Sequence, residues 1–159
     1  MLKQALIMSV LPLMMAVNHA GAQDAPPPSP QATKIQTLVD KAAALVDKQG
    51  KAALAEFRKH DSEWWSGNTY LFAYDMNLNV LLNPAFPQRE GTNAHGEKDS
   101  NGVFFHDEFV KVVQAKGSGW VSYLFPKPGQ TQPSTKWSYV KAINVDGTPG
   151  LIGAGFYPE

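Results

Sequence analysis

A lysine beside aromatic residues is the part of this sequence best suited to bind a small carboxylate. Such an anion needs a cation or several hydrogen-bond donors in a partly dry site, while aromatic walls exclude water and set the shape. Lys136, within Lys136-Trp137-Ser138-Tyr139-Val140-Lys141, is the predicted anchor, and Arg89 is a loop cation that can close over the ligand. The candidate walls and donors are Tyr70, Phe72, Trp120, Tyr123 and Tyr139.

Strand geometry limits which of these side chains can meet. Alternate residues of a strand share a face, so Lys136 and Ser138 point one way while Trp137, Tyr139 and Lys141 point the other way. Lys136 and Tyr139 can therefore reach one pocket only across a β-bulge or at a sheet edge.

Each candidate also has a simpler interpretation. The aromatic residues could be ordinary core packing, because aromatic side chains dominate cores as well as binding sites. Lys136 could be a solvated residue at a strand edge, since lysine is seldom buried without a partner. Arg89 could be a surface charge of little energetic weight. Trp64-Trp65 is expected to pack the end of a helix against the sheet rather than to form a partner patch.

Motifs for catalysis and metal binding are missing from the sequence. It contains no cysteine, which excludes disulfides, zinc thiolates and thiol nucleophiles. His60, His95 and His106 lack the spacing of metal ligands, and there is no G-x-S-x-G motif or glycine-rich phosphate loop. His95 with Glu97 and Asp99 is the one local acid–base cluster, which we interpret as a polar loop. We expect no enzyme, no metal and no cofactor; a small exported enzyme using His95 or His106 is the third alternative.

The N-terminus has the three parts of a secretory signal peptide. Lys3 is the charged start, an apolar run covers residues 5–17, and Ala20 and Ala22 form an A-x-A arrangement. The run of about thirteen residues is shorter than the roughly 18 to 20 that span a bilayer as a helix, so we predict cleavage before Gln23 rather than a retained anchor. A proline-rich spacer over 23–33 should follow, in a soluble periplasmic protein.

The charge balance and hydrophobic patterning predict one α+β domain over residues 34–159. With 14 basic and 14 acidic residues, the chain offers no basic surface for nucleic acid. Apolar residues at a helical period predict a long amphipathic helix from Thr33 to Phe57, interrupted at Gly50. Five mostly antiparallel strands are expected, and a long segment from Ala85 to Ser118 should contain a helix over 106–116. The predicted strands lie near residues 70–75, 80–84, 119–125, 136–144 and 151–157.

The N-terminal helix and eight further segments, in order, resemble a single Cache domain of the second single-Cache type. The resemblance covers nearly all of the chain after the predicted signal peptide, and it implies a PAS-like antiparallel sheet with a long N-terminal helix. It also implies an extracytoplasmic sensor whose ligands are mainly small organic acids, and a homodimer formed through the N-terminal helix. The segments are the N-terminal helix and the stretches at 50–57, 70–75, 83–84, 91–93, 98–102, 119–123, 136–141 and 152–157.

Two departures from the family pattern affect the expected function. Asn83-Pro84 stands where the family commonly has His-Pro, and asparagine keeps hydrogen bonding but cannot change charge near neutral pH. We therefore include Asn83 among the ligand-binding candidates and expect the ligand to differ. The chain ends at Glu159, where related sensors continue into a membrane helix, so a separate membrane signalling partner is expected.

The leading hypothesis is therefore an exported sensor domain that reversibly binds an acid of the acetate, propionate, lactate or pyruvate class. The alternative is a dimerisation or protein-interaction module whose pocket is closed by its own side chains.

Overall fold

The computed structural model describes residues 24–159. The predicted signal peptide and its cleavage before Gln23 lie outside the described residues. Among the residues described, no helix is long and apolar enough to cross a membrane.

Helix α1 (Pro30–Gln49) begins inside the predicted spacer. The Ser29 hydroxyl accepts a hydrogen bond from the N–H of Ala32 at 3.1 Å, and Pro30 occupies the first helical position. Proline is tolerated there because that N–H has no partner within the helix. The spacer prediction, which extended to residue 33, was therefore too long, and Thr33 is not the N-cap.

Gly50 separates α1 from α2 (Lys51–Glu56), which confirms the predicted break. Its φ of 59° is in the left-handed region, and a Cβ placed there would lie 1.6 Å from Oδ1 of Asp146. The other oxygen of Asp146 accepts the N–H of Lys51 at 3.1 Å. Only glycine allows this close approach between the helices and the turn at Asp146.

Over residues 24–159 the sheet has six strands, and every pairing in it is antiparallel. The order is β1-β2-β6-β5-β4, with β3 also pairing with β2. The five predicted strands are confirmed, and β1 was missed because two residues are too few to show a period. The strands are β1 (Trp65–Ser66), β2 (Thr69–Asp75), β3 (Val80–Leu82), β4 (Ser118–Pro126), β5 (Pro133–Val145) and β6 (Thr148–Phe156).

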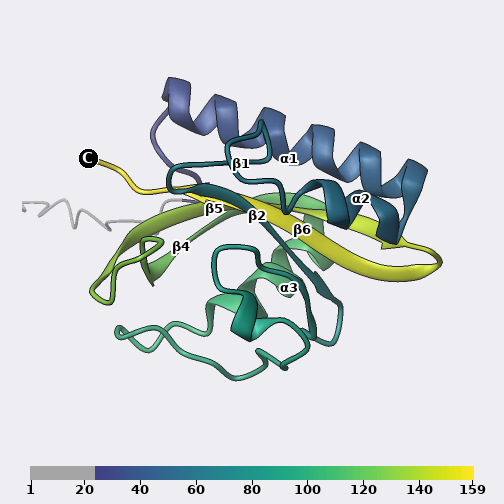
Figure 1. Cartoon of the computed structure of the whole chain (residues 1–159). Helices are drawn as coiled ribbons and strands as arrows, with labels where there is room; N and C mark the ends of the chain where they lie inside the picture. The colour runs from purple at the N-terminus through teal and green to yellow at the C-terminus, as the bar shows by residue number, and fades with distance from the viewer. Residues whose placement is uncertain (1–23) are drawn as a thin grey trace, which may run out of the picture.

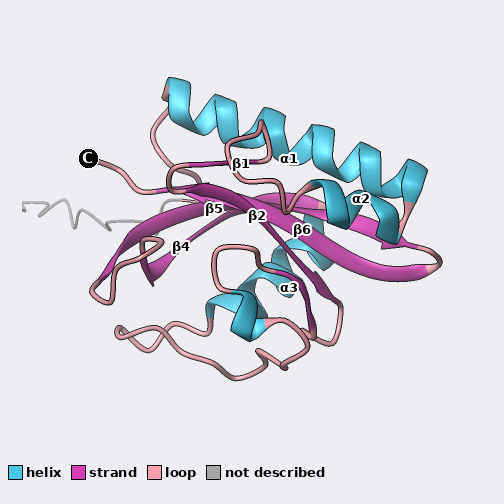
Figure 2. Cartoon of the chain, viewed as in Figure 1, coloured by secondary structure: helices cyan, strands magenta, loops and turns pink. Residues whose placement is uncertain are grey.

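The sheet separates two hydrophobic cores. Helix α1 lies across one face, whereas α3 (Phe105–Lys116) and the long loop after β3 cover the other face (Figures 1 and 2). Strand β2 supplies both cores by alternation: Leu71 and Ala73 face α1, while Tyr70, Phe72 and Tyr74 face α3. The α3 face is therefore the aromatic face of the sheet.

The long segment between β3 and β4 confirms the predicted helix, which begins one residue earlier than expected. It also contains a short 3-10 helix, η1 (Pro87–Arg89). Asp99 holds the rest of the loop, because its carboxylate accepts the backbone N–H groups of Asn101, Val103 and Leu124. The last of these bonds ties the predicted turn at 98–102 to β4.

Of the two tryptophans before β2, Trp64 packs as expected at the helix end, whereas Trp65 is partly buried against the core on the α3 face. Trp64 belongs to the α1 core and lies against Phe57, with ring centroids 4.8 Å apart. The homodimer through α1 stays a prediction.

Candidate functional site

The ammonium group of Lys136 lies inside an aromatic enclosure on the α3 face. The residue is 1% exposed, and its Nζ donates a hydrogen bond to the Tyr70 hydroxyl at 3.1 Å. Nζ lies close to four ring centroids: 4.4 Å from Tyr70, 5.7 Å from Phe72, 5.3 Å from Phe125 and 5.4 Å from Tyr157. We call these four rings the Lys136 cage. Attraction to their π faces partly replaces the water that the cation has lost.

No carboxylate compensates the charge of Lys136 within the part of the chain that the structure describes: none lies within 4.0 Å of Nζ. Burial lowers the pKa of Lys136 to about 7 because the low-dielectric interior disfavours the charged form. The interpretation of Lys136 as a solvated edge residue is therefore wrong. A buried ammonium of this kind is suited to receive an anion.

Three strands and two small residues hold Lys136 in place. Its neighbour on the same face of β5, Ser138, shares a 2.9 Å hydrogen bond with the Tyr123 hydroxyl from β4. Gly155 on β6 leaves room for the lysine stem, since a Cβ there would lie 2.8 Å from Cε of Lys136 and 2.4 Å from Oγ of Ser138. The lysine therefore lies flat against the β6 backbone, which directs Nζ into the cage.

A second layer of polar residues lies beside the cage, between the sheet and α3. Nε2 of His106 is 3.1 Å from the Tyr74 hydroxyl, and its Nδ1 is 3.5 Å from the Glu97 carboxylate. Burial lowers the pKa of His106 to about 4, so this imidazole is neutral at neutral pH.

Arg89 joins this layer through a two-pronged contact with Glu97. Its Nη1 donates to Oε1 at 3.0 Å, and its Nη2 donates to Oε2. These hydrogen bonds raise the pKa of Arg89. The guanidinium carbon lies 5.9 Å from the centroid of Phe125, one of the cage rings. The predicted loop cation is thus next to the cage, but its charge is already paired.

The structure brings four of the eight predicted site residues together on the α3 face: Tyr70, Phe72, Tyr123 and Lys136. Asn83 is buried directly after β3, and its backbone N–H donates to Glu90 at 2.8 Å. Its side-chain oxygen is also buried, without a hydrogen-bond partner among the described residues. The ligand-binding roles of these residues stay predictions.

Trp120 and Tyr139 require a correction, because they lie on the opposite face of the sheet. Both pack into the α1 core with ring centroids 5.2 Å apart, and the Tyr139 hydroxyl donates to Ser118. The β4–β5 pairing runs in one register from Ser118↔Lys141 to Pro126↔Pro133. No bulge turns Tyr139 toward Lys136, so Trp120 and Tyr139 cannot line the same site as the cage.

Sequence reasoning missed several residues around Lys136. Strand alternation placed Ser138 on the face of Lys136 without making it a candidate, and it could also have found Phe125, two positions from Tyr123. Tyr157 follows the last residue of β6, where no period indicates its direction, and His106 comes from a helix whose docking the sequence does not specify.

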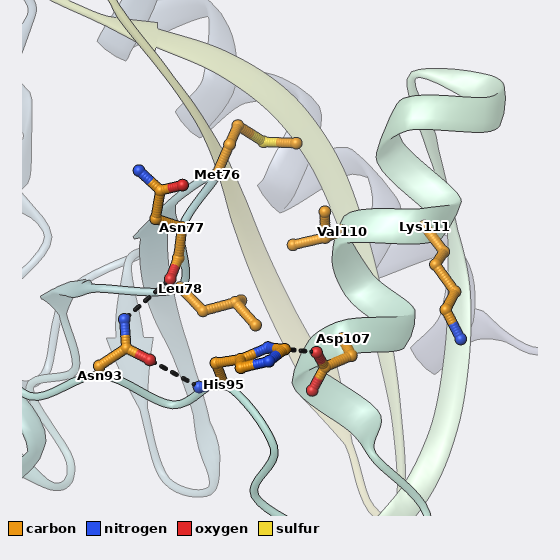
Figure 3. Close-up of a pocket in the computed structure, with 8 residues that line it drawn as sticks. All are labelled: Met76, Asn77, Leu78, Asn93, His95, Asp107, Val110 and Lys111. Carbon is orange, nitrogen blue, oxygen red and sulfur yellow. Dashed lines mark hydrogen bonds and ion pairs between the residues drawn. The ribbon is translucent and has the colours of Figure 1, made fainter.

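The segment from His95 to Asp99 is a polar loop, as expected from the sequence, and its charged side chains pair with other parts of the chain. His95 contacts Asp107 of α3 with 2.7 Å between Nδ1 and Oδ1, while Asn93 accepts the backbone N–H of His95 (Figure 3). These residues line an open hollow of about 480 Å³, in which Lys111 points away from His95 (Figure 3). Over residues 24–159 no group of three potential metal-ligating side chains occurs.

An antiparallel sheet with a long N-terminal helix across one face is the architecture expected of a Cache domain. The profile of the family described as "Single Cache domain 2" matches residues 33–158. The chain therefore belongs to the Single Cache domain 2 family.

Curated relatives include two bacterial receptors. The "Methyl-accepting chemotaxis protein McpP" of Pseudomonas putida is 28% identical over 90 residues, which is 57% of this chain and 16% of that protein. The "Sensor histidine kinase MctS" of Rhizobium johnstonii is 28% identical over 123 residues, or 77% of this chain and 25% of that protein. The matches thus span a quarter or less of these receptors.

Solved structures confirm the fold. A "Periplasmic sensor domain of chemotaxis protein" superposes with a TM-score of 0.72 and 34% identity, covering 81% of this chain and 95% of that one. A second structure, described as the "Structural basis for carboxylic acid recognition by a Cache chemosensory domain", gives a TM-score of 0.69 and 27% identity, with coverages of 80% and 93%. The chain is thus similar to the sensor domains of chemotaxis receptors.

Proposed function

We propose that this protein is an exported, periplasmic sensor domain that reversibly binds a small organic acid of the acetate, propionate, lactate or pyruvate class. The buried ammonium of Lys136, without a carboxylate partner among the described residues, carries the proposal. The similarity to a Cache domain that recognises carboxylic acids supports the same ligand class.

The ligand carboxylate is held in this proposal by Lys136 and Tyr70. Burial raises the pKa of Tyr70, so its hydroxyl keeps its proton and can donate to an anion. The carboxylate accepts one charge-assisted bond from Nζ and one bond from the Tyr70 hydroxyl. The rings of Phe72, Phe125 and Tyr157 enclose the short carbon chain, which favours acids of two or three carbons over longer ones.

Signal transfer requires a second protein in this proposal. The loop over 85–104 contacts the cage through Phe86 and Arg89, so binding can shift the populations of its conformations. A separate membrane protein would read that shift. Cell fractionation that finds the protein in the cytoplasm would contradict the export on which this step depends.

A thermal-shift screen against small organic acids and amino acids tests the ligand class. A ligand at 100 times its dissociation constant should add about 2.7 kcal/mol to the unfolding free energy. We expect at least one acid of two or three carbons to raise the melting temperature, and the neutral amide of the same acid to leave it unchanged. Cooperative melting without a shift across the panel would instead favour the closed interaction module.

Replacing Gly155 with alanine should weaken acid binding on the order of tenfold, because the new Cβ displaces the Lys136 stem. Gly119→Ala is the matched control: a Cβ there lies 2.6 Å from Cγ1 of Val112 and meets neither the lysine nor a cage ring. Both changes should lower stability by about 1–3 kcal/mol through overpacking. Calorimetric titration with propionate compares the two, and equal losses of affinity would show that Gly155 does not position Lys136.

A further inference from the structure

The cage is closed to solvent where its residues come from the strands. An acid that binds Lys136 must therefore pass between buried side chains. Lys136 and Tyr70 are each 1% exposed and Phe72 is 3% exposed. Phe125 is only partly buried and is therefore a less protected part of the enclosure.

A pocket lies directly outside Phe125. It has a volume of about 480 Å³, and its lining includes Phe86, Arg89, Glu97, Phe105 and Phe125. Phe125 thus belongs to both spaces: its ring lines this pocket and is also 5.3 Å from Nζ of Lys136. The pocket and the cage share a wall that is one aromatic ring thick.

Phe86 completes this wall from the loop side. Its ring packs edge-on against Phe125 with centroids 5.3 Å apart, and it lies 6.0 Å from the ring of Tyr70. Phe86 is on the loop directly before η1, whereas Phe125 is on a sheet strand. Loop positions move more readily than strand positions, so Phe86 is the ring that can swing aside.

Arg89 connects Phe86 to an ion pair with Glu97. Its backbone N–H donates to the carbonyl of Phe86 at 3.0 Å, and its guanidinium binds Glu97 while lying over the face of Phe125. The Nε of Arg89 is buried and has no hydrogen-bond partner within residues 24–159. Opening the loop would therefore also offer an unused donor to an arriving carboxylate.

We propose that this pocket is the access site for the carboxylate, that Phe86 and Phe125 form the gate to Lys136, and that the Arg89–Glu97 ion pair holds the gate closed. The proposal rests on the proposed acid binding and adds the path by which the ligand enters and leaves. Because a gate changes the barrier and not the bound state, it should control the two rate constants more than their ratio.

The test is exchange of ¹³C-labelled propionate measured by NMR line shape on the purified protein. Phe86→Ala should raise the association and dissociation rate constants together by about tenfold and change Kd by less than about threefold. Glu97→Gln keeps the shape of the side chain but removes the charge that holds Arg89. It should therefore also raise both rate constants. Phe104→Ala is the control, because this ring is 41% exposed, packs under Lys98, and is neither a cage ring nor a lining residue of the pocket.

The possible outcomes separate the gate from the binding site. If Phe86→Ala fails to fold, Glu97→Gln alone decides, and unchanged rates in that variant would overturn the gate. A rise in the dissociation rate alone would identify Phe86 as an ordinary wall of the site and equally overturn the proposal. If the unmodified protein binds no acid at all, the proposed function itself fails. Binding with normal affinity and unaltered rates in both variants would reject only the gate.

Discussion

Replacing Lys136 with methionine is expected to abolish acid binding and, at the same time, to make the ligand-free protein more stable. Methionine has a similar volume and keeps the stem packed against Gly155, but it removes the buried ammonium. An uncompensated charge in the interior opposes folding, so its removal should add on the order of a few kcal/mol to the unfolding free energy at pH 6. The loss of one hydrogen bond to Tyr70, about 1 kcal/mol, reduces this gain.

Lys141→Met provides the matched control on the same strand. Lys141 points to the opposite face and pairs with Asp40 of α1 at 2.7 Å, with both side chains substantially exposed. Its replacement should lower stability by about 0–1 kcal/mol and leave acid binding unchanged. The two variants therefore differ in the sign of the stability change as well as in binding.

Thermal and urea unfolding without ligand, together with calorimetric titration of propionate, measure both effects. A Lys136→Met variant that is less stable than the parent would mean that the lysine is a structural element of the core. A variant that still binds propionate with the parent's affinity would mean that the acid does not bind at the cage.

The sequence predicted the faces of the strands better than it predicted which face holds the site. Alternation placed Lys136 and Ser138 opposite Tyr139, and the structure has this arrangement. Trp120 and Tyr139 are nevertheless among the candidates, because the sequence does not distinguish an aromatic residue that packs under α1 from one that lines the cage. Burial of both sheet faces removes the polar alternation that would have distinguished them.

The parts of the site that come from distant segments could not be predicted. Tyr157 and Phe125 meet around Nζ only because the sheet order places β6 beside β5 and β5 beside β4. The neutral state of His106 depends on how α3 docks, which no local pattern encodes. Two helix ends, in contrast, have capping residues of a recognisable type, Ser29 before α1 and Gly117 after α3, although the sequence analysis placed the first N-cap at Thr33.

The affinity for the acid should fall as the pH rises above about 7. In the ligand-free protein the pKa of Lys136 is about 7, so at higher pH the amine must take up a proton before it can hold an anion. The apparent association constant should then decrease by up to about tenfold per pH unit between pH 7 and pH 9. Burial raises the pKa values of Tyr70 and Tyr123, and they do not titrate in this range.

Stability without ligand should change in the opposite direction over the same range. Burial lowers the folded-state pKa of Lys136 to about 7, whereas the unfolded value is near 10.5, so the unfolded chain binds more protons between these values. The unfolding free energy therefore rises with pH, by on the order of 2 kcal/mol from pH 7 to pH 9, and Lys136→Met should lack this increment. On the acid side, His106 has a folded-state pKa of about 4 against 6.5 unfolded, so stability is lost as the pH falls from 6.5 toward 4 in both proteins.

Calorimetry with propionate at pH 8, in two buffers of different ionisation enthalpy, measures the proton uptake directly. Nearly one proton should be taken up per acid bound at this pH, and almost none at pH 6, where Lys136 is already charged. Gly119→Ala should show the same uptake, because its Cβ meets Val112 rather than the lysine or a cage ring. Affinity that stays constant from pH 6 to pH 9 without proton uptake would mean that the acid is held by a permanently charged group, and Arg89, released from Glu97, would then be the anchor to test.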